Sequence, residues 1–272
     1  YIDELIILDI LQSKTVKISS IPYFFNYHVS VYNLKNKLQL DKLWEREEKL
    51  FLNSIQINDT GGSALPVKTD VTNYNDLLEL VNKTISKYKK IDILVNCAGT
   101  TNGNPSHEYT QSDWELTIST NLKSAFDLSQ LVGKEMINTG KGGSIINITS
   151  VAAVLASPEN PAYNAAKGGL RQLTKALAAD WGIYNIRVNN LGPGYFHTEL
   201  NEKSWKDPKL RKIRSDRSLL KRWAEPFEII GPAIFLASDA SSFITGQDIY
   251  VDGGFLAKSL WFKILTYKGS KY

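Results

Sequence analysis

The chain has 272 residues, of which 43% are hydrophobic and 22% charged, and this composition excludes disorder over most of its length. Its net charge of +4 comes without a long basic block and gives little support for a nucleic-acid or membrane-surface partner. Cys97 is the single cysteine and the histidines are isolated, which excludes an internal disulfide, a cysteine-based zinc site and an HExxH motif; we expect no metal.

Helices and short strands alternate after Gly61, whereas residues 1–60 contain no glycine. Helical spacing of apolar residues predicts helices over 42–52, 75–88, 112–136, 162–181 and 226–237. Short apolar runs predict strands over 64–68, 91–95, 144–148, 186–190 and 247–251. Continuous apolar strands separated by helices indicate an α/β fold, a doubly wound parallel sheet buried on both faces.

The ends of three predicted strands carry small and polar residues, at 96–99, at Ser150 and at Pro193-Gly194. In doubly wound folds, ligands bind beyond the carboxyl ends of the strands. We therefore expect the functional site at this edge of the sheet.

Tyr163 and Lys167 lie four residues apart in a predicted helix, so they share one face. A phenol has a pKa near 10, and a neighbouring ammonium group lowers it by favouring the phenolate. Such a pair suits proton transfer to or from a carbonyl oxygen during hydride transfer. On its own, a Tyr-x-x-x-Lys spacing is more often an ordinary surface pair, and Ser150 alone is more often a helix cap.

Several segments together change these odds. They are 145–167, VNCAG at 95–99, NLKSAF after Thr120, RVNNLGPGYFHTEL at 187–200 and ASDASSFITGQDIYVDGGF at 237–255. In this order and spacing they resemble the short-chain dehydrogenase/reductase family over about residues 43–255. The resemblance implies a Rossmann-type domain that moves a hydride between NAD or NADP and a carbonyl or alcohol.

The resemblance also implies roles for individual residues. Tyr163 is the expected general acid/base, Lys167 lowers its pKa and holds the nicotinamide ribose, Ser150 binds the substrate oxygen, and Asn121 shapes the helix that supports a proton-relay water. The expected cofactor-binding residues are Asp70, Val71, Asn96, Ala98, Gly99, Tyr163, Lys167, Pro193, Gly194, Tyr195 and Thr198.

The substrate is expected to be a small molecule bound under the long polar segment 195–222, which we predict to be a lid loop. Segment 217–226 looks like the arginine-containing segment of sugar-acid members. Segments 161–181 and 193–198 are similar to gluconate 5-dehydrogenase-like and 2-deoxygluconate 3-dehydrogenase-like members. Arginine suits a carboxylate because its planar fork binds two oxygens. A sugar acid or polyol is therefore the first hypothesis, and a 3-oxoacyl carrier-protein reductase is the alternative.

One family feature is missing. The glycine-rich turn that meets the cofactor phosphates is expected within about residues 15–30, where the sequence has no glycine. Either an altered or misassembled N-terminal sequence precedes an intact reductase, or the protein keeps the fold as a scaffold without binding a dinucleotide. The joint presence of Asn121, Ser150, Tyr163 and Lys167 favours the first explanation. Arg46 hints at NADP, although an exposed helix arginine explains it equally well.

The domain hypothesis is an atypical N-terminal segment 1–44, with the first βαβ portion incomplete, a reductase domain 45–256 and a tail 257–272. Segment 5–11 carries Asp9 without preceding basic residues, unlike a signal peptide, and no apolar run reaches the roughly 18 residues of a membrane span. We expect a cytoplasmic protein with no nucleic-acid or membrane partner. Helices 112–136 and 162–181 are expected to pair copies of the chain into a dimer or tetramer.

Overall fold

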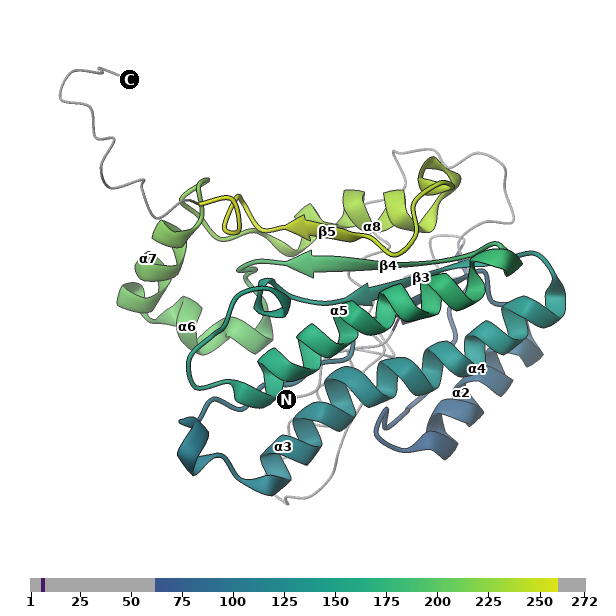
Figure 1. Cartoon of the computed structure of the whole chain (residues 1–272), viewed down its shortest axis with the longest axis horizontal. Helices are drawn as coiled ribbons and strands as arrows, with labels where there is room; N and C mark the ends of the chain where they lie inside the picture. Colours follow the sequence, from purple (N-terminus) through teal and green to yellow (C-terminus); the bar gives the residue numbers. More distant parts are fainter. Residues whose placement is uncertain (1–5, 8–61, 259–272) are drawn as a thin grey trace.

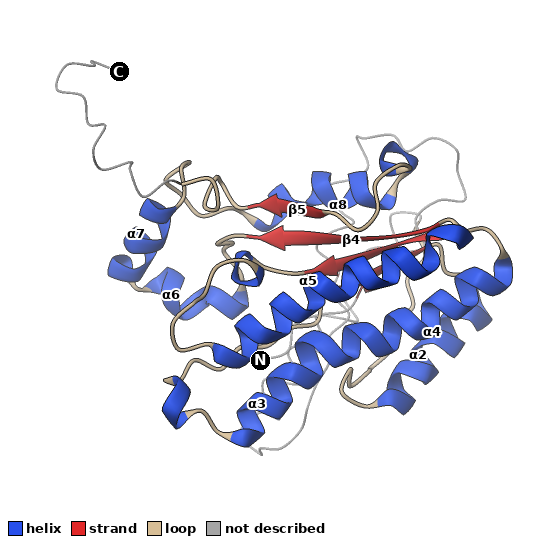
Figure 2. Ribbon diagram, viewed as in Figure 1, coloured by secondary structure: helices blue, strands red, loops and turns tan. Residues whose placement is uncertain are grey.

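The computed structural model describes residues 6–7 and 62–258, in which helices cover both faces of a five-stranded sheet (Figure 1, Figure 2). The strand order is β1-β2-β3-β4-β5. Neighbouring strands are parallel from β2 to β5: β2 (Ile93–Asn96), β3 (Gly143–Ile148), β4 (Ile186–Pro193) and β5 (Asp248–Val251). The edge strand β1 (Ile6–Ile7) pairs antiparallel with β2. The predicted parallel, doubly covered sheet is confirmed.

Successive strand residues face two separate apolar cores, because side chains alternate between the faces of a sheet. Leu94, Ile145 and Val188 pack in the core shared with α2, α4 and α5, whereas Ile93 and Ile146 face the core of α8. The bounds of these helices are α2 (Tyr74–Tyr88), α4 (Ser124–Thr139), α5 (Pro161–Trp181) and α8 (Ile230–Ala237). Burial on both faces explains why the strands read as continuous apolar runs.

Local signals fix where several helices begin and end. Asn73 caps α2 by accepting a hydrogen bond from the Asn75 backbone N–H at 3.0 Å, and Thr110 caps α3 (Gln111–Ile118) through the Asp113 N–H at 3.1 Å. Pro161 occupies the first turn of α5, where its missing N–H costs nothing. Gly140 ends α4 at φ +66°, a conformation that favours glycine.

A ladder of polar side chains crosses the sheet on the face covered by α4 and α5. Asn96 donates to Asn147 (2.7 Å), and Asn147 donates to Thr174 of α5 (2.7 Å). Thr174 donates to Asn190 (2.6 Å), which in turn donates to Asp248 (2.8 Å). The three asparagines and Asp248 are register partners on successive strands, so the ladder fixes the register of β2 to β5.

Three predicted elements differ in the structure. Residues 64–68 form no strand, because no described strand lies beside them to supply a ladder of hydrogen bonds. The helix predicted over 112–136 is α3 and α4 joined by a π-helical turn, Ser119–Lys123. The predicted lid loop 195–222 instead contains two helices, α6 (Glu202–Lys206) and α7 (Pro208–Arg217), the second capped by Asp207 through the N–H groups of Lys209 and Leu210.

The helix predicted over 42–52, the expected turn region 15–30 and Arg46 lie outside the described residues. Within the described part of the chain, none of the helices has the length and apolar character needed to cross a membrane. The same residues contain no cluster of three or more histidine, cysteine or acidic side chains suited to a metal ion.

Candidate active site

The predicted reactive side chains meet where β3 ends and α5 begins. Tyr163 and Lys167 lie one turn apart near the start of α5, and Ser150 follows β3 by two residues. A hydrogen bond joins the side chains of Ser150 and Tyr163. The Lys167 ammonium is 3% exposed, donates to the Ile148 carbonyl oxygen at 2.7 Å and lies 5.7 Å from the centre of the Tyr163 ring. The structure therefore places Ser150, Tyr163 and Lys167 close together, as the sequence predicted.

The same burial shifts the pKa values of the two ionisable groups in opposite directions. Burial raises the pKa of Tyr163 above 10, and its hydrogen bond with Ser150 only partly offsets this effect. Burial lowers the pKa of Lys167 to about 8, opposed by the charge interaction with Cys97. The net shift of the Tyr163 pKa is upward, because the loss of water around the phenol outweighs its favourable contacts. The expected role of Lys167 in lowering this pKa stays a prediction.

Asn121 joins two segments through its side chain. It lies in the π-helical turn between α3 and α4, and its side-chain amide donates to the Thr100 carbonyl (2.9 Å) and the Thr117 carbonyl (2.8 Å). Its side-chain oxygen accepts the Thr100 N–H at 3.2 Å. Both amide protons are therefore used, and the side chain fastens the loop after β2 to the last turn of α3.

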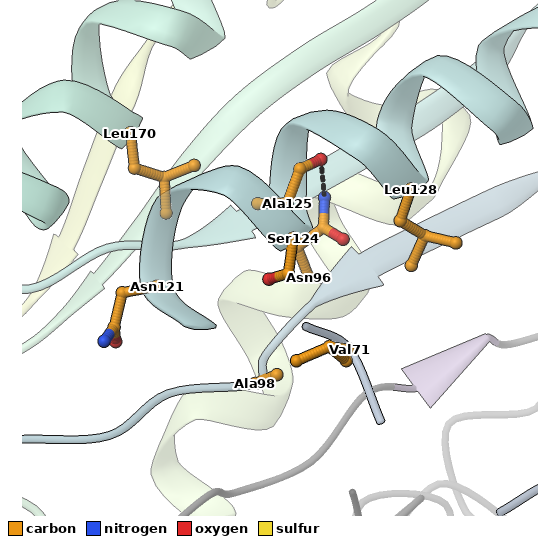
Figure 3. Close-up of a pocket in the computed structure, with 8 residues that line it drawn as sticks. All are labelled: Val71, Asn96, Ala98, Asn121, Ser124, Ala125, Leu128 and Leu170. Atoms are coloured by element: carbon orange, nitrogen blue, oxygen red, sulfur yellow. Dashed lines mark hydrogen bonds between the residues drawn. The ribbon is translucent and has the colours of Figure 1, made fainter. Parts of the chain in front are cut away.

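A small pocket at the carboxyl end of β2 joins several of the predicted cofactor residues (Figure 3). Val71 and Ala98 line one side, and α4 and the π-helical turn line the other. The full lining is Val71, Asn96, Ala98, Asn121, Ser124, Ala125, Leu128 and Leu170. The lining mixes small and apolar side chains with the polar side chains of Asn96, Asn121 and Ser124.

Two predicted cofactor residues use their polar groups inside the protein. Asn96 is 6% exposed, and its side-chain amide nitrogen donates to Ser129 (2.9 Å) as well as to Asn147. The Asp70 carboxylate oxygen Oδ1 accepts hydrogen bonds from the Thr72 N–H (2.9 Å) and hydroxyl (2.7 Å). These hydrogen bonds stabilise the edge of the sheet. They compete with any direct hydrogen bond from the same side-chain atoms to a cofactor.

Two glycines leave little room for a side chain: Gly99, beside Lys167, and Gly194, just after β4. A Cβ on Gly99 would lie 3.1 Å from the Asn121 side-chain oxygen, and one on Gly194 would lie 2.8 Å from the Asp252 Cα. Gly99 follows β2 and lies against both Asn121 and Lys167. The glycine therefore permits close approach of backbone and side chains at the centre of the site.

The other cofactor-binding residues predicted around the end of β4 lie in three different places: the strand itself, an aromatic cluster and the surface. Pro193 is the last residue of β4, and Thr198 is exposed. Tyr195 belongs to an aromatic cluster that we define as Tyr195, Trp205, Trp223 and Phe255. Within it the Tyr195 ring centre lies 5.3 Å from that of Trp223 and 5.7 Å from that of Phe255, and Trp205 lies 5.4 Å from Trp223.

The predicted arginine-containing segment is partly committed to structure. Arg222 binds Glu228 through two parallel hydrogen bonds of 2.7 Å each, and this pairing lowers the pKa of Glu228 to about 2. Arg217 lies over the Phe255 ring, 5.0 Å from its centre. Arg222 is therefore occupied by an internal carboxylate, Glu228, in this structure.

Known proteins match this arrangement in both sequence and structure. A family model described as enoyl-(acyl carrier protein) reductase matches residues 43–256. The gluconate 5-dehydrogenase of Gluconobacter oxydans is 40% identical over 185 residues, which are 68% of this chain and 72% of that protein. The 2-dehydro-3-deoxy-D-gluconate 5-dehydrogenase of Dickeya dadantii is 36% identical over 203 residues, 75% and 80% of the two chains. This chain belongs to the short-chain dehydrogenase/reductase family.

A solved short-chain dehydrogenase/reductase structure agrees with the fold. The gluconate 5-dehydrogenase of Burkholderia cenocepacia, solved in complex with NADP and tartrate, has a TM-score of 0.75 and 36% identity, and the match covers 85% of this chain and 87% of that one. The architecture predicted from the strand and helix pattern is thus shared with an enzyme of the same family.

The described residues of this family member include part of the surface expected to meet the dinucleotide. Lys167, Tyr163 and Ser150 present polar groups at one place, and the pocket lined by Val71 and Ala98 lies at the carboxyl end of β2. The segment expected to meet the phosphates lies outside the described residues, and its sequence has no glycine.

Sequence reasoning missed the asparagine ladder and the two helices of segment 195–222. The ladder could have been predicted from the sequence, because the apolar strands 93–96, 143–148 and 186–193 each contain an asparagine near the carboxyl end. The helices had a weaker one, the Asp207-Pro208 pair, which is typical of a helix start.

Proposed function

We propose that this chain is an NAD(P)-dependent dehydrogenase that exchanges a hydride with a carbinol carbon of a sugar acid or polyol. The observation that carries the proposal is the meeting of Ser150, Tyr163 and Lys167 at the end of β3, with Tyr163 hydrogen-bonded to Ser150 and Lys167 held by the Ile148 carbonyl. Its similarity to gluconate and deoxygluconate dehydrogenases supports the substrate class.

Each residue has a distinct proposed role. The Ser150 hydroxyl binds the reacting oxygen of the substrate, and the Tyr163 phenol exchanges a proton with that oxygen as the carbon gains or loses hydride. Lys167 holds the ribose and contributes positive charge beside the phenol. Asn121 acts as a positioning residue through Thr100, because its side chain is occupied by backbone groups.

NAD(P), when bound, supplies the carbon that accepts or donates the hydride. Val71, Ala98, Gly99, Lys167, Pro193 and Gly194 are the residues proposed to hold it, together with Asp70, Tyr195 and Thr198 at the margins.

A 3-oxoacyl carrier-protein reductase and a cofactor-free scaffold remain the alternatives. The sugar-acid and polyol relatives disfavour the first. The glycine-free sequence over 15–30 favours the second. Self-association through α3, α4 and α5, a cytoplasmic location and the domain limits at 44 and 256 stay predictions.

Two measurements on the full chain distinguish these functions. Calorimetric titration with NAD and NADP tests cofactor binding, and the nicotinamide absorbance tests turnover with D-gluconate, D-glucitol and a 3-oxoacyl thioester. We expect binding of at least one cofactor and turnover of a sugar acid or polyol. Turnover of the thioester alone would support the acyl reductase, and absence of both binding and turnover would support the scaffold.

A further inference from the structure

Arginines of α7 lie over the aromatic cluster at the end of the sheet. Arg214 has its guanidinium carbon 4.9 Å from the Tyr195 ring centre and 5.8 Å from that of Trp223. One turn earlier, Arg211 lies 5.2 Å from the centre of Trp205. Aromatic faces attract a guanidinium and hold its plane without using its N–H groups, so those donors stay available for an anion.

The aromatic cluster adjoins the strand ends that carry the reactive residues. Tyr195 lies two residues beyond β4, whose Leu191 is the register partner of Ile148 on β3, two residues before Ser150. Adjacent strands are about 4.8 Å apart, so Tyr195 of the cluster and Ser150 follow the ends of neighbouring strands. Figure 1 shows α6 and α7 at the end of the molecule toward which β4 and β5 point.

Arg214 has no carboxylate partner among the described residues. Arg171 is bound to Asp248 at 2.6 Å and Arg222 to Glu228, whereas no described carboxylate forms an ion pair with Arg214, Arg211 or Arg217. Arg214 is half-buried, whereas Arg211 and Arg217 are exposed. Arg214 is therefore the one of these three whose guanidinium is both held in place and open to an anion from outside.

The surrounding segment strengthens the positive potential. Residues 202–222 contain nine basic residues against three acidic residues, an excess of six positive charges that exceeds the +4 of the whole chain. A concentration of one charge sign beside a site raises the local concentration of oppositely charged substrates.

We propose that Arg214, seated on Tyr195 and Trp223, binds the carboxylate of an anionic hydroxy-acid substrate and so selects sugar acids over neutral polyols. This inference rests on the proposed function, which makes Ser150, Tyr163 and Lys167 the reacting site. It adds Arg214 as the residue that determines which class of substrate binds there. Arg222 already pairs with Glu228, whereas Arg214 lies on α7, before the predicted arginine-containing segment 217–226, and has no described carboxylate partner.

The kinetic test uses a matched pair of substrates. D-gluconate and D-glucitol share five hydroxylated carbons and differ at the carboxylate that D-glucitol replaces by an alcohol. For Arg214→Met, which keeps an unbranched stem against the aromatic rings, we expect kcat/KM to fall about 10- to 100-fold with D-gluconate and less than about 3-fold with D-glucitol. Arg214→Lys is expected to fall between wild type and Arg214→Met, because it keeps the charge and loses the fork.

Lys212→Met is the matched control, since Lys212 lies on the same helix but pairs with Asp216 at 3.0 Å and is 77% exposed. It should leave both substrates unchanged within about 2-fold. Equal losses with D-gluconate and D-glucitol in Arg214→Met would overturn the inference, because they would indicate a purely structural role. So would unchanged turnover of D-gluconate.

A binding test separates this inference from the proposed function. Calorimetric titration of the wild-type chain with D-gluconate and D-glucitol, with and without NADP, requires no turnover. Tighter binding of D-gluconate that disappears in Arg214→Met supports the inference even if no hydride transfer is found. If D-gluconate binds no more tightly than D-glucitol, or equally well to Arg214→Met, the inference is wrong whatever the turnover.

Discussion

Tyr163 and Lys167 are one helical turn apart, and the same exclusion of water acts on both. Burial raises the pKa of the phenol and lowers that of the ammonium to about 8, so each neutral form is favoured. The sequence predicted that the two side chains lie one helical turn apart, but it did not predict that the pKa of Tyr163 is raised. The missing quantity was the degree of burial, which depends on how the ends of β3 and β2 pack around α5.

The lowered pKa of Lys167 makes stability depend on pH in a defined window. Between pH 8 and about 10.5 the unfolded chain binds more protons than the folded one, so the stability contributed by this site rises as pH rises. The test compares two chains, Tyr163→Phe and the double variant Tyr163→Phe/Lys167→Met. We expect the unfolding free energy of the first, relative to the second, to increase by about 2 to 3 kcal/mol between pH 7 and pH 10.

Urea unfolding of both chains at the two pH values measures this gap. The Tyr163→Phe background removes the raised phenol pKa, whose contribution has the opposite sign: it is lost as pH rises above 10. A gap that stays constant with pH would show that Lys167 is not desolvated in the folded chain.

Most elements were predictable because both their faces are buried. The strands β2 to β5 and the long helix α5 appear within a few residues of the predicted ranges, since apolar runs and helical spacing dominate there. The π-helical turn at 119–123 was not predictable, because it arises from the fit of Asn121 to Thr100 rather than from local propensity. Residues 64–68 have strand composition but no neighbouring strand in the described chain.

The asparagine ladder gives an element-scale prediction. Asn147 lies at its centre with 0% exposure and connects Asn96 to Thr174. Asn147→Leu removes both hydrogen bonds, and we expect a loss of about 1 to 3 kcal/mol in unfolding free energy by urea titration. Asn82→Leu, at an exposed position of α2, is the control and should change stability by less than about 0.5 kcal/mol. Equal effects of the two substitutions would contradict a structural role for the ladder.

At the scale of the whole molecule, charge is distributed unevenly. The basic excess of residues 202–222 lies over the same end of the sheet as Ser150 and Tyr163, whereas the composition alone suggested only a solvated basic face. A summed net charge hides this segregation, since acidic residues elsewhere cancel it. The folding of segment 202–222 into α6 and α7 gathers the charge beside the site.

This distribution predicts an effect of salt on one substrate only. Raising the ionic strength from about 0.01 M to 0.15 M shortens the Debye length from about 30 Å to about 8 Å. We expect KM for D-gluconate to rise several-fold over this range and KM for D-glucitol to stay constant, as steady-state assays of the wild-type chain would measure. Parallel changes for both substrates would exclude electrostatic attraction as the cause.

The central claim is that the Tyr163 phenol exchanges the proton that accompanies hydride transfer. Steady-state turnover of Tyr163→Phe, compared with wild type at the same pH, tests it most directly. We predict that kcat falls about 10²- to 10⁴-fold while calorimetric cofactor affinity and the urea unfolding midpoint stay within error of wild type. A Tyr163→Phe chain that is folded, binds cofactor and turns over at the wild-type rate would contradict the claim.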